Sequence, residues 1–372
     1  MVSHQNTCLV ICVEKDAEKA IMKEYDKQYA LYSAFDEKMK KLIWDLINEN
    51  NLRVHSVTSR IKTKTSLRVK LARLERKFSE LSDVADISGL RIVTYFADDV
   101  DSVAKVIARE FDVDMERSVD KRALLDPDRF GYLSLHYVVK LPADRLRLTE
   151  YRRFANCQAE IQIRSILQHA WAEIEHDLGY KGKHAVPREI QRRFSRLAGL
   201  LELADAEFAQ IRGSLLEYEK NVPKQIAEAP ETVLIDKASL LSFIKTSSLV
   251  HKFDRKIALI SESEVIEEET IVDFLVGQLK FVGFYTIAQL DSYLHSYGEM
   301  AVRFAENWIE HKYETVSAGI SLYYLNLVSL GSKRYPYEEA HRFWKTFLYE
   351  NPEGLAEKLC SVYSKVERKQ DE

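Results

Sequence analysis

The short segment that begins at Ala159 is the feature that most constrains how this chain can fold. Its residues, AEIQIR, alternate strictly between apolar and polar side chains. Successive side chains of a β-strand point to opposite faces, so Glu160, Gln162 and Arg164 share one face and their apolar neighbours share the other. The pattern predicts a strand with one packed face. Its other face, which carries a carboxylate, an amide and a guanidinium, is either a solvated side of a sheet or part of a site.

Two further runs predict strands, at 89–96 and 132–141, beside the strand at 158–165. Helical spacing of apolar residues is found over 15–50, over 101–110 and, with an interruption near 179–187, over 166–219. The sequence therefore predicts an α+β domain in which a sheet is flanked by helices.

Prolines indicate a domain boundary after this region. Pro223 and Pro230 interrupt the helical pattern. We predict a first domain over 1–220, a linker over 221–235 and an all-α domain over 236–372. Within the last domain the acidic run 261–270 is predicted to be a solvated loop, and Gly283 a turn between two helices.

Several protein classes are excluded by what the sequence lacks. No apolar stretch approaches the roughly 20 residues that a membrane-spanning helix needs. The apolar run at 7–13 is too short for a signal peptide. The four cysteines show no paired spacing suited to zinc, and we interpret them as reduced. We expect a cytoplasmic protein that does not bind membranes.

A positive patch lies within this mildly acidic chain, whose net charge is −4. Residues 60–77 carry eight Lys or Arg against one Glu. Helical spacing places Ser66 and Lys70 on one face, with Arg60 and Lys62 upstream in a less regular segment. Arg and Lys both bind phosphate oxygens, so the patch is either a phosphate site or a solvated basic helix.

A second acid, Asp86, stands at the start of the predicted strand 89–96. Two converging carboxylates are a common way to hold Mg²⁺ that carries the phosphates of a nucleotide. Asp86 and Arg91 differ by an odd number of positions, which puts them on opposite faces of a regular strand. Both can face one site only if Gly89 hosts a bulge or if Asp86 lies before the strand.

Five ordered motifs resemble the synthetase domain of the RelA/SpoT family over about residues 40–215. The motifs are Arg60-x-Lys62-x3-Ser66-x3-Lys70, Asp86-x4-Arg91, Gly131-Tyr132-x-Ser134-Leu135-His136, Glu160-Ile-Gln162-Ile-Arg164 and the stretch 171–181. The resemblance implies a mixed sheet related to the nucleotidyltransferase fold. It also implies a reaction in which the β,γ-pyrophosphate of ATP moves to a ribose 3′-hydroxyl and AMP leaves.

The resemblance also implies a role for each matched residue. Asp86 and Glu160 would be catalytic and hold Mg²⁺, with Glu160 helping to deprotonate the hydroxyl. ATP would be bound by Arg60, Lys62, Ser66, Lys70, Arg91 and Arg164. The acceptor side would consist of Tyr132, His136 and Gln162.

The acceptor side departs from the family pattern. Alarmone synthetases usually carry a Lys and an Asn before the Gly-Tyr pair, whereas this chain has Asp128 and Phe130. This departure and the long helical extension resemble toxic small synthetases, in particular the fused toxin–antitoxin CapRel type. That resemblance implies transfer to the 3′-terminal adenosine of tRNA, restraint by the C-terminal domain, and release by a phage protein.

Two alternatives stay open. The chain could be a (p)ppGpp synthetase that uses GDP or GTP as the acceptor, or an inactive nucleotide-binding regulator. A metal site formed by His169, Glu173 and His176, which fall on one side of a predicted helix, is a weaker hypothesis, because no further ligand cluster accompanies them.

Overall fold

The computed structural model describes residues 2–72, 78–120, 134–178, 187–268 and 270–368, and for 2–16 and 270 only the backbone. It divides into two compact units, Met1–Arg212 and Gly213–Glu372. Each unit has its own hydrophobic core. We describe the two units separately.

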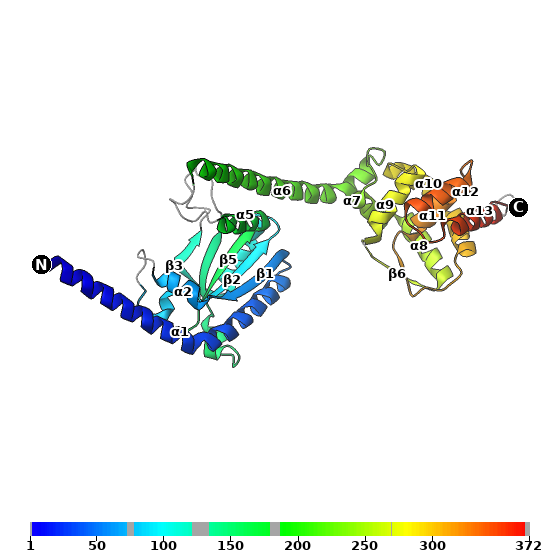
Figure 1. The fold of residues 1–372 in the computed structure, drawn as a ribbon. Helices are drawn as coiled ribbons and strands as arrows, with labels where there is room; N and C mark the ends of the chain where they lie inside the picture. The colour runs from blue at the N-terminus through cyan, green and yellow to red at the C-terminus, as the bar shows by residue number, and fades with distance from the viewer. Residues whose placement is uncertain (1, 73–77, 121–133, 179–186, 269, 369–372) are drawn as a thin grey trace. The chain divides into compact units, whose positions relative to one another are not determined.

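The first unit contains a five-stranded sheet (Figure 1). Its strands, in spatial order, are β1 (Val54–Ile61), β2 (Ser88–Thr94), β5 (Ala159–Ser165), β4 (Leu135–Lys140) and β3 (Asp112–Asp120). The central strands β2 and β5 run parallel, and the other neighbours pair antiparallel. The sheet is therefore mixed, as predicted.

Helices accompany this sheet, and the last of them begins in the first unit and continues into the second. They are α1 (Val2–Glu49), α2 (Lys64–Leu71), α3 (Asp99–Glu110), α4 (Ala143–Leu146), α5 (Ile166–Asp177) and α6 (Arg188–Glu228), with short 3₁₀ turns η1 (Leu81–Asp83) and η2 (Arg152–Phe154). Helix α1 packs against β1 and β2, and α3 packs against β3 and β5. The apolar side chains of α1, α3 and the sheet form one core, which includes the alternating Ile161 and Ile163. The other face of the sheet carries Glu160, Gln162 and Arg164 together with the buried Val93 and Val138.

Two strands were missed in the sequence prediction, which treated residues 60–62 as irregular and assigned nothing to 112–120. Both lie at the edges of the sheet. Only Val57 of β1 is fully buried, and β3 has no fully buried residue. An edge strand with little buried surface does not need the apolar run by which central strands are recognised.

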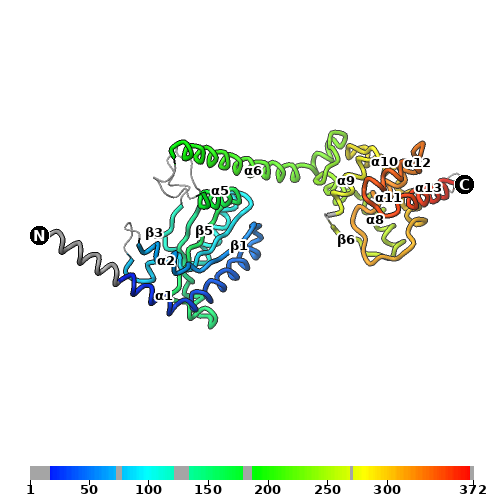
Figure 2. The backbone as a smooth tube through the Cα atoms, in the orientation of Figure 1, coloured from blue at the N-terminus to red at the C-terminus, as the bar shows by residue number. Residues whose placement is uncertain are grey.

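Pro223 does not end a helix, contrary to our expectation. It lies inside α6, which continues to Glu228 as one uninterrupted helix (Figure 2). A proline removes one backbone hydrogen bond, and the 41 residues of this helix retain many others. The division of the chain at 221–235 stays a prediction.

The second unit is mainly helical. Its helices are α7 (Lys237–Thr246), α8 (Ser248–Ser261), α9 (Thr270–Val282), α10 (Ile287–Trp308), α11 (Ile320–Gly331), α12 (Pro336–Thr346) and α13 (Pro352–Arg368). Gly283 turns the chain between α9 and α10 with a φ of +107°, as expected of a glycine there. The run 261–270 is not all loop, since β6 (Glu264–Ile266) pairs in parallel with β7 (Thr315–Ser317). Throughout the described ranges, every helix is too short or too polar to cross a membrane.

Candidate active site

Asp86 lies in the turn that precedes β2, at the polar face of the sheet. Each of its carboxylate oxygens is 2.7 Å from an ammonium group, one from Lys62 at the end of β1 and the other from Lys70 on α2. Burial by itself would raise the pKa of Asp86, but the hydrogen bonds and charges of the two lysines outweigh it and lower that pKa. Asp86 is therefore held as a carboxylate between two cations.

Glu160 is the second residue of β5. Its Oε1 lies 2.7 Å from Nδ1 of His136 on β4, and Nε2 of the same ring lies 2.7 Å from Oγ of the buried Ser134. A neutral His136 satisfies both contacts when Nδ1 carries the proton, because a carboxylate can only accept. Burial raises the pKa of Glu160, but the hydrogen bond from His136 and the nearby positive charges together outweigh it, and the net effect is a lowered pKa.

The two carboxylates are close enough to influence each other. The charge of Asp86 counts among the causes that raise the pKa of Glu160. Strands β2 and β5 bring them together, because Gly89 stands opposite Glu160 in the parallel ladder. The ladder is regular through Gly89 on both sides. Of our two expectations, the bulge is wrong, and Asp86 lies before the strand.

The sheet register gathers the other matched residues on the same face. Arg60 of β1 stands opposite Gly89, Arg91 of β2 stands opposite Gln162 of β5, and Gln162 stands opposite His136 of β4. Directly paired residues of neighbouring strands point to the same side of a sheet. The structure therefore brings four of the predicted ATP and acceptor residues onto the face that carries Glu160.

Arg91 and Arg164 meet a residue that we had not assigned to the site. Glu173 of α5 places Oε1 2.8 Å from Nη1 of Arg91 and 3.5 Å from Nη2 of Arg164. The side chain of Arg164 is 3% exposed, whereas that of Glu173 is 55% exposed. The sequence signal was present, since Glu173 lies within the 171–181 stretch that resembles the family.

His169 lies near this group, with Nδ1 3.7 Å from Oε1 of Glu173. Burial and the positive charges of Arg164 and Arg91 lower the pKa of His169. Within the described residues, no cluster of three or more His, Cys, Asp and Glu side chains could hold a metal ion. Glu173 instead contacts the two arginines.

Ser66 and Lys70 lie on α2, as predicted. Thr63 caps this helix, since its Oγ1 accepts a hydrogen bond from N of Ser66 and donates one to Oγ of Ser66. Lys70, in the last turn, contacts Asp86. Tyr132, together with Asp128 and Phe130, lies outside the described residues.

Comparison with known proteins identifies relatives of this chain. Residues 59–185 match the family model described as the region found in RelA / SpoT proteins. The GTP pyrophosphokinase YjbM of Bacillus subtilis is 31% identical over 165 residues, which cover 44% of this chain and 74% of that protein. The GTP pyrophosphokinase YwaC of the same organism is 28% identical over 206 residues, 53% of this chain and 94% of that protein.

Among solved structures, the small alarmone synthetase 1 of Bacillus subtilis bound to its product pppGpp is 27% identical. The match covers 52% of this chain and 99% of that chain, with a TM-score of 0.44. The matches to the family model and to YjbM confirm the resemblance to a synthetase domain, whereas the toxin and tRNA parts of the resemblance stay predictions. The chain belongs to the RelA/SpoT family and is a pyrophosphokinase of that type.

Proposed function

We propose that this enzyme transfers the β,γ-pyrophosphate of ATP to the 3′-hydroxyl of a guanine nucleotide, GDP or GTP, and releases AMP. The observation that carries the proposal is the pair of mostly buried carboxylates, Asp86 and Glu160, on a sheet face with Arg60 and Arg91. Two relatives of which this chain covers most of the length are named GTP pyrophosphokinases. For this reason we now rank the guanine nucleotide above the tRNA acceptor that the sequence alone favoured.

The donor side is built to compensate negative charge. Lys62 and Lys70 lie at Asp86, and Arg60 and Arg91 are on the neighbouring strands β1 and β2. Phosphoryl-type transfer depends on positioning and charge neutralisation more than on covalent chemistry. We assign the two lysines and Ser66 to the phosphates of ATP, and Arg60, Arg91 and Arg164 to the rest of the nucleotide.

Glu160 is the residue that would accept the proton of the attacking hydroxyl. Its lowered pKa keeps it ionised at neutral pH, and His136 fixes its orientation. A general base must be deprotonated and within hydrogen-bond reach of the proton that it removes. We therefore place the ribose of the acceptor beside Glu160, with Gln162 and Tyr132 on the acceptor side.

Magnesium fits the carboxylate pair. Hard oxygen ligands suit Mg²⁺, which commonly binds one or two carboxylates together with substrate phosphates and water. Asp86 and Glu160 provide two such ligands close enough for their charges to interact. When bound, the ion would neutralise charge on the triphosphate. In the chain by itself, Lys62 and Lys70 compensate the charge of Asp86.

The proposal is tested by incubating the purified protein and Mg²⁺ with γ-labelled ATP and GDP, GTP or tRNA in separate reactions. We expect label in the guanine nucleotides, because the γ-phosphate is part of the transferred pyrophosphate. Label in tRNA alone would overturn the assignment of the acceptor. A folded protein that labels none of them would favour the inactive regulator, whereas a Glu160→Gln variant with full activity would overturn the assignment of Glu160 to the site.

The second candidate acceptor is the 3′-terminal adenosine of tRNA. One sequence observation favours it, namely that Asp128 and Phe130 replace the cation and amide usual in alarmone synthetases. Loss of a cation weakens binding of the 5′-phosphates of a free nucleotide. Restraint by the C-terminal unit and release by a phage protein belong to this candidate.

A further inference from the structure

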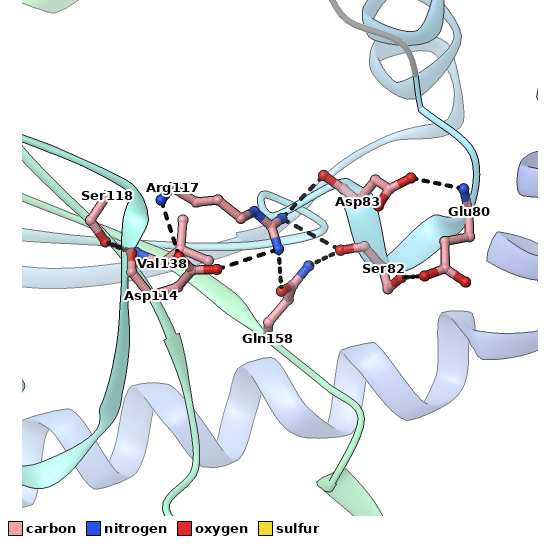
Figure 3. Close-up of polar contacts among 8 residues, drawn as sticks. All are labelled: Glu80, Ser82, Asp83, Asp114, Arg117, Ser118, Val138 and Gln158. Carbon is pink, nitrogen blue, oxygen red and sulfur yellow. Dashed lines mark hydrogen bonds and ion pairs between the residues drawn. The ribbon is translucent and has the colours of Figure 1, made fainter.

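Arg117 of β3 reaches away from its own strand to the turn that leads to Asp86 (Figure 3). Its Nη2 donates to the backbone carbonyl of Asp83 at 3.1 Å and to that of Ser82 at 3.4 Å. These two residues belong to η1, which ends three positions before Asp86. A planar guanidinium with several donors is suited to holding two neighbouring carbonyl groups at once.

Gln158 joins the same network from the start of β5. Its Oε1 accepts from Nη1 of Arg117 at 3.1 Å, and its Nε2 donates to the carbonyl of Ser82 at 2.5 Å (Figure 3). Gln158 is 2% exposed, so both ends of its amide need partners and both have one. It stands two positions before Glu160. One guanidinium and one amide therefore connect the segments that carry the two carboxylates.

An irregularity in β3 precedes this contact. The pairing of β3 with β4 shifts between Asp114 and Val119. Within the shift, N of Arg117 donates to Oδ1 of Asp114, and Oγ of Ser118 both donates to the carbonyl of Asp114 and accepts from N of Val138. Bulges often redirect a side chain beside an active site. Here, the bulge is secured by its own hydrogen bonds, and Arg117 projects from it.

Asp86 needs such support because it stands outside the sheet ladder. The pairing of β2 with β5 begins at Ser88 and Ala159, two positions after Asp86. Ladder hydrogen bonds thus fix Glu160 but not Asp86. The backbone around Asp86 is held by the bond from N of Lys62 to the carbonyl of Ile87 and by the bonds from Arg117 and Gln158 to η1.

We propose that Arg117 and Gln158 are positioning residues that set the distance between Asp86 and Glu160, and so the geometry with which the pair binds a divalent cation. This inference rests on the proposed function, in which the two carboxylates share that ion. Neither residue contacts the carboxylates themselves in the bonds described. They act through the backbone of η1 and through the start of β5.

The test compares Arg117→Met and Arg117→Lys with the native protein. Binding of Mn²⁺ is measured by electron paramagnetic resonance in the presence of a non-hydrolysable ATP analogue, and kcat and KM for ATP are measured with Mg²⁺. We expect about tenfold weaker Mn²⁺ binding and a similar loss of kcat in Arg117→Met, the size expected for losing charge-assisted hydrogen bonds. We expect KM for ATP to stay within about twofold, because Arg117 is not assigned to the nucleotide.

Arg117→Lys retains the positive charge but not the planar guanidinium that can donate to two carbonyl groups at once. We expect it to recover part of the affinity for Mn²⁺. Arg117→Lys also tests the proposal if Arg117→Met does not fold. The matched control is Arg147→Met, since Arg147 is an exposed arginine that pairs with Asp144 at 3.4 Å. Native Mn²⁺ affinity in the folded Arg117 variants, or an equal loss in the control, would overturn the proposal.

Asp86→Asn separates this inference from the proposed function. We expect it to weaken Mn²⁺ binding more than any Arg117 variant. If Asp86→Asn binds Mn²⁺ like the native protein, the carboxylate pair is not the metal site and both proposals are wrong. If Asp86→Asn loses Mn²⁺ while the Arg117 variants retain it, only the positioning role is wrong.

Discussion

His136 and Glu160 connect the strands β4 and β5 across the polar face of the sheet, with 2.7 Å between Nδ1 and Oε1. Since Ser134 contacts the other ring nitrogen at 2.7 Å, the ring is fixed on both sides. This contact orients the carboxylate that we assign as the general base, and it lowers the pKa of that group.

Replacing His136 by Ala should slow pyrophosphate transfer by about 10- to 100-fold, the effect of losing one hydrogen bond to a charged group. The loss should be mainly in kcat, because His136 orients the base and does not hold ATP. Initial rates at saturating ATP and acceptor measure it. His295→Ala, which removes an exposed histidine of the second unit, should leave the rate unchanged. A loss confined to KM would contradict the assignment.

Acid should remove a stabilising contribution that Glu160 makes at neutral pH. The folded-state pKa of Glu160 is below its ordinary value of 4.5. A carboxyl group with a lowered pKa stabilises the fold above its ordinary pKa, and this contribution is lost as the pH falls through the folded value. The difference in Tm between the native protein and Glu160→Gln should therefore shrink as the pH falls from neutrality to below 4.5. A constant difference would show that Glu160 does not titrate as described.

Lys70 and Asp86 should be energetically coupled. The side chains are 24% and 20% exposed, so the pair is partly shielded from water. We expect Lys70→Met to lower the free energy of unfolding by about 1–2 kcal/mol in the native background and by less in an Asp86→Asn background. Chemical denaturation of the four proteins of this double-mutant cycle measures the coupling. Equal effects in the two backgrounds would mean that the contact contributes no coupling energy.

Glu173→Gln should weaken ATP binding without slowing the chemical step. Glu173 contacts Arg91, which we assign to the nucleotide, but its side chain is 55% exposed. An exposed ion pair contributes up to about 1 kcal/mol, which corresponds to an increase in KM of up to about fivefold. The control is Glu202→Gln, on the exposed surface of α6. An unchanged KM with a reduced kcat would contradict the role of Glu173 in orienting Arg91.

A chain that ends at Glu228 should test whether the second unit restrains the first. The cut that the sequence suggests, near Asn221, falls inside α6, whereas Glu228 is its last residue. The tRNA candidate, to which this restraint belongs, predicts that the shortened protein folds and shows at least about tenfold higher activity, within the usual range of coupling between sites. Circular dichroism and the labelled-ATP assay measure both quantities. A folded but inactive product would instead mean that the second unit completes the enzyme.

The sequence predicted the geometry of the central strand β5 well, because its signals there are local. The alternation over 159–164 correctly placed Glu160, Gln162 and Arg164 on one face of a buried strand. Asp86 and Arg91 differ by an odd number of positions, so the sequence correctly required either a bulge in the strand or a position of Asp86 before it. The structure has Asp86 before the strand. The edge strands β1 and β3 were missed because they bury too little apolar surface to show a pattern.

The sequence by itself determined which residue types face the site, since the periodicity of a strand or helix fixes the direction of each side chain. Only the tertiary structure decided which of them meet. Lys62 and Lys70 contact Asp86, Glu173 contacts Arg91, and Arg117 reaches the turn before Asp86. These contacts join residues far apart along the chain, and their partners depend on how strands and helices pack. The spacing of residues within one strand or helix does not show how that strand or helix packs against others.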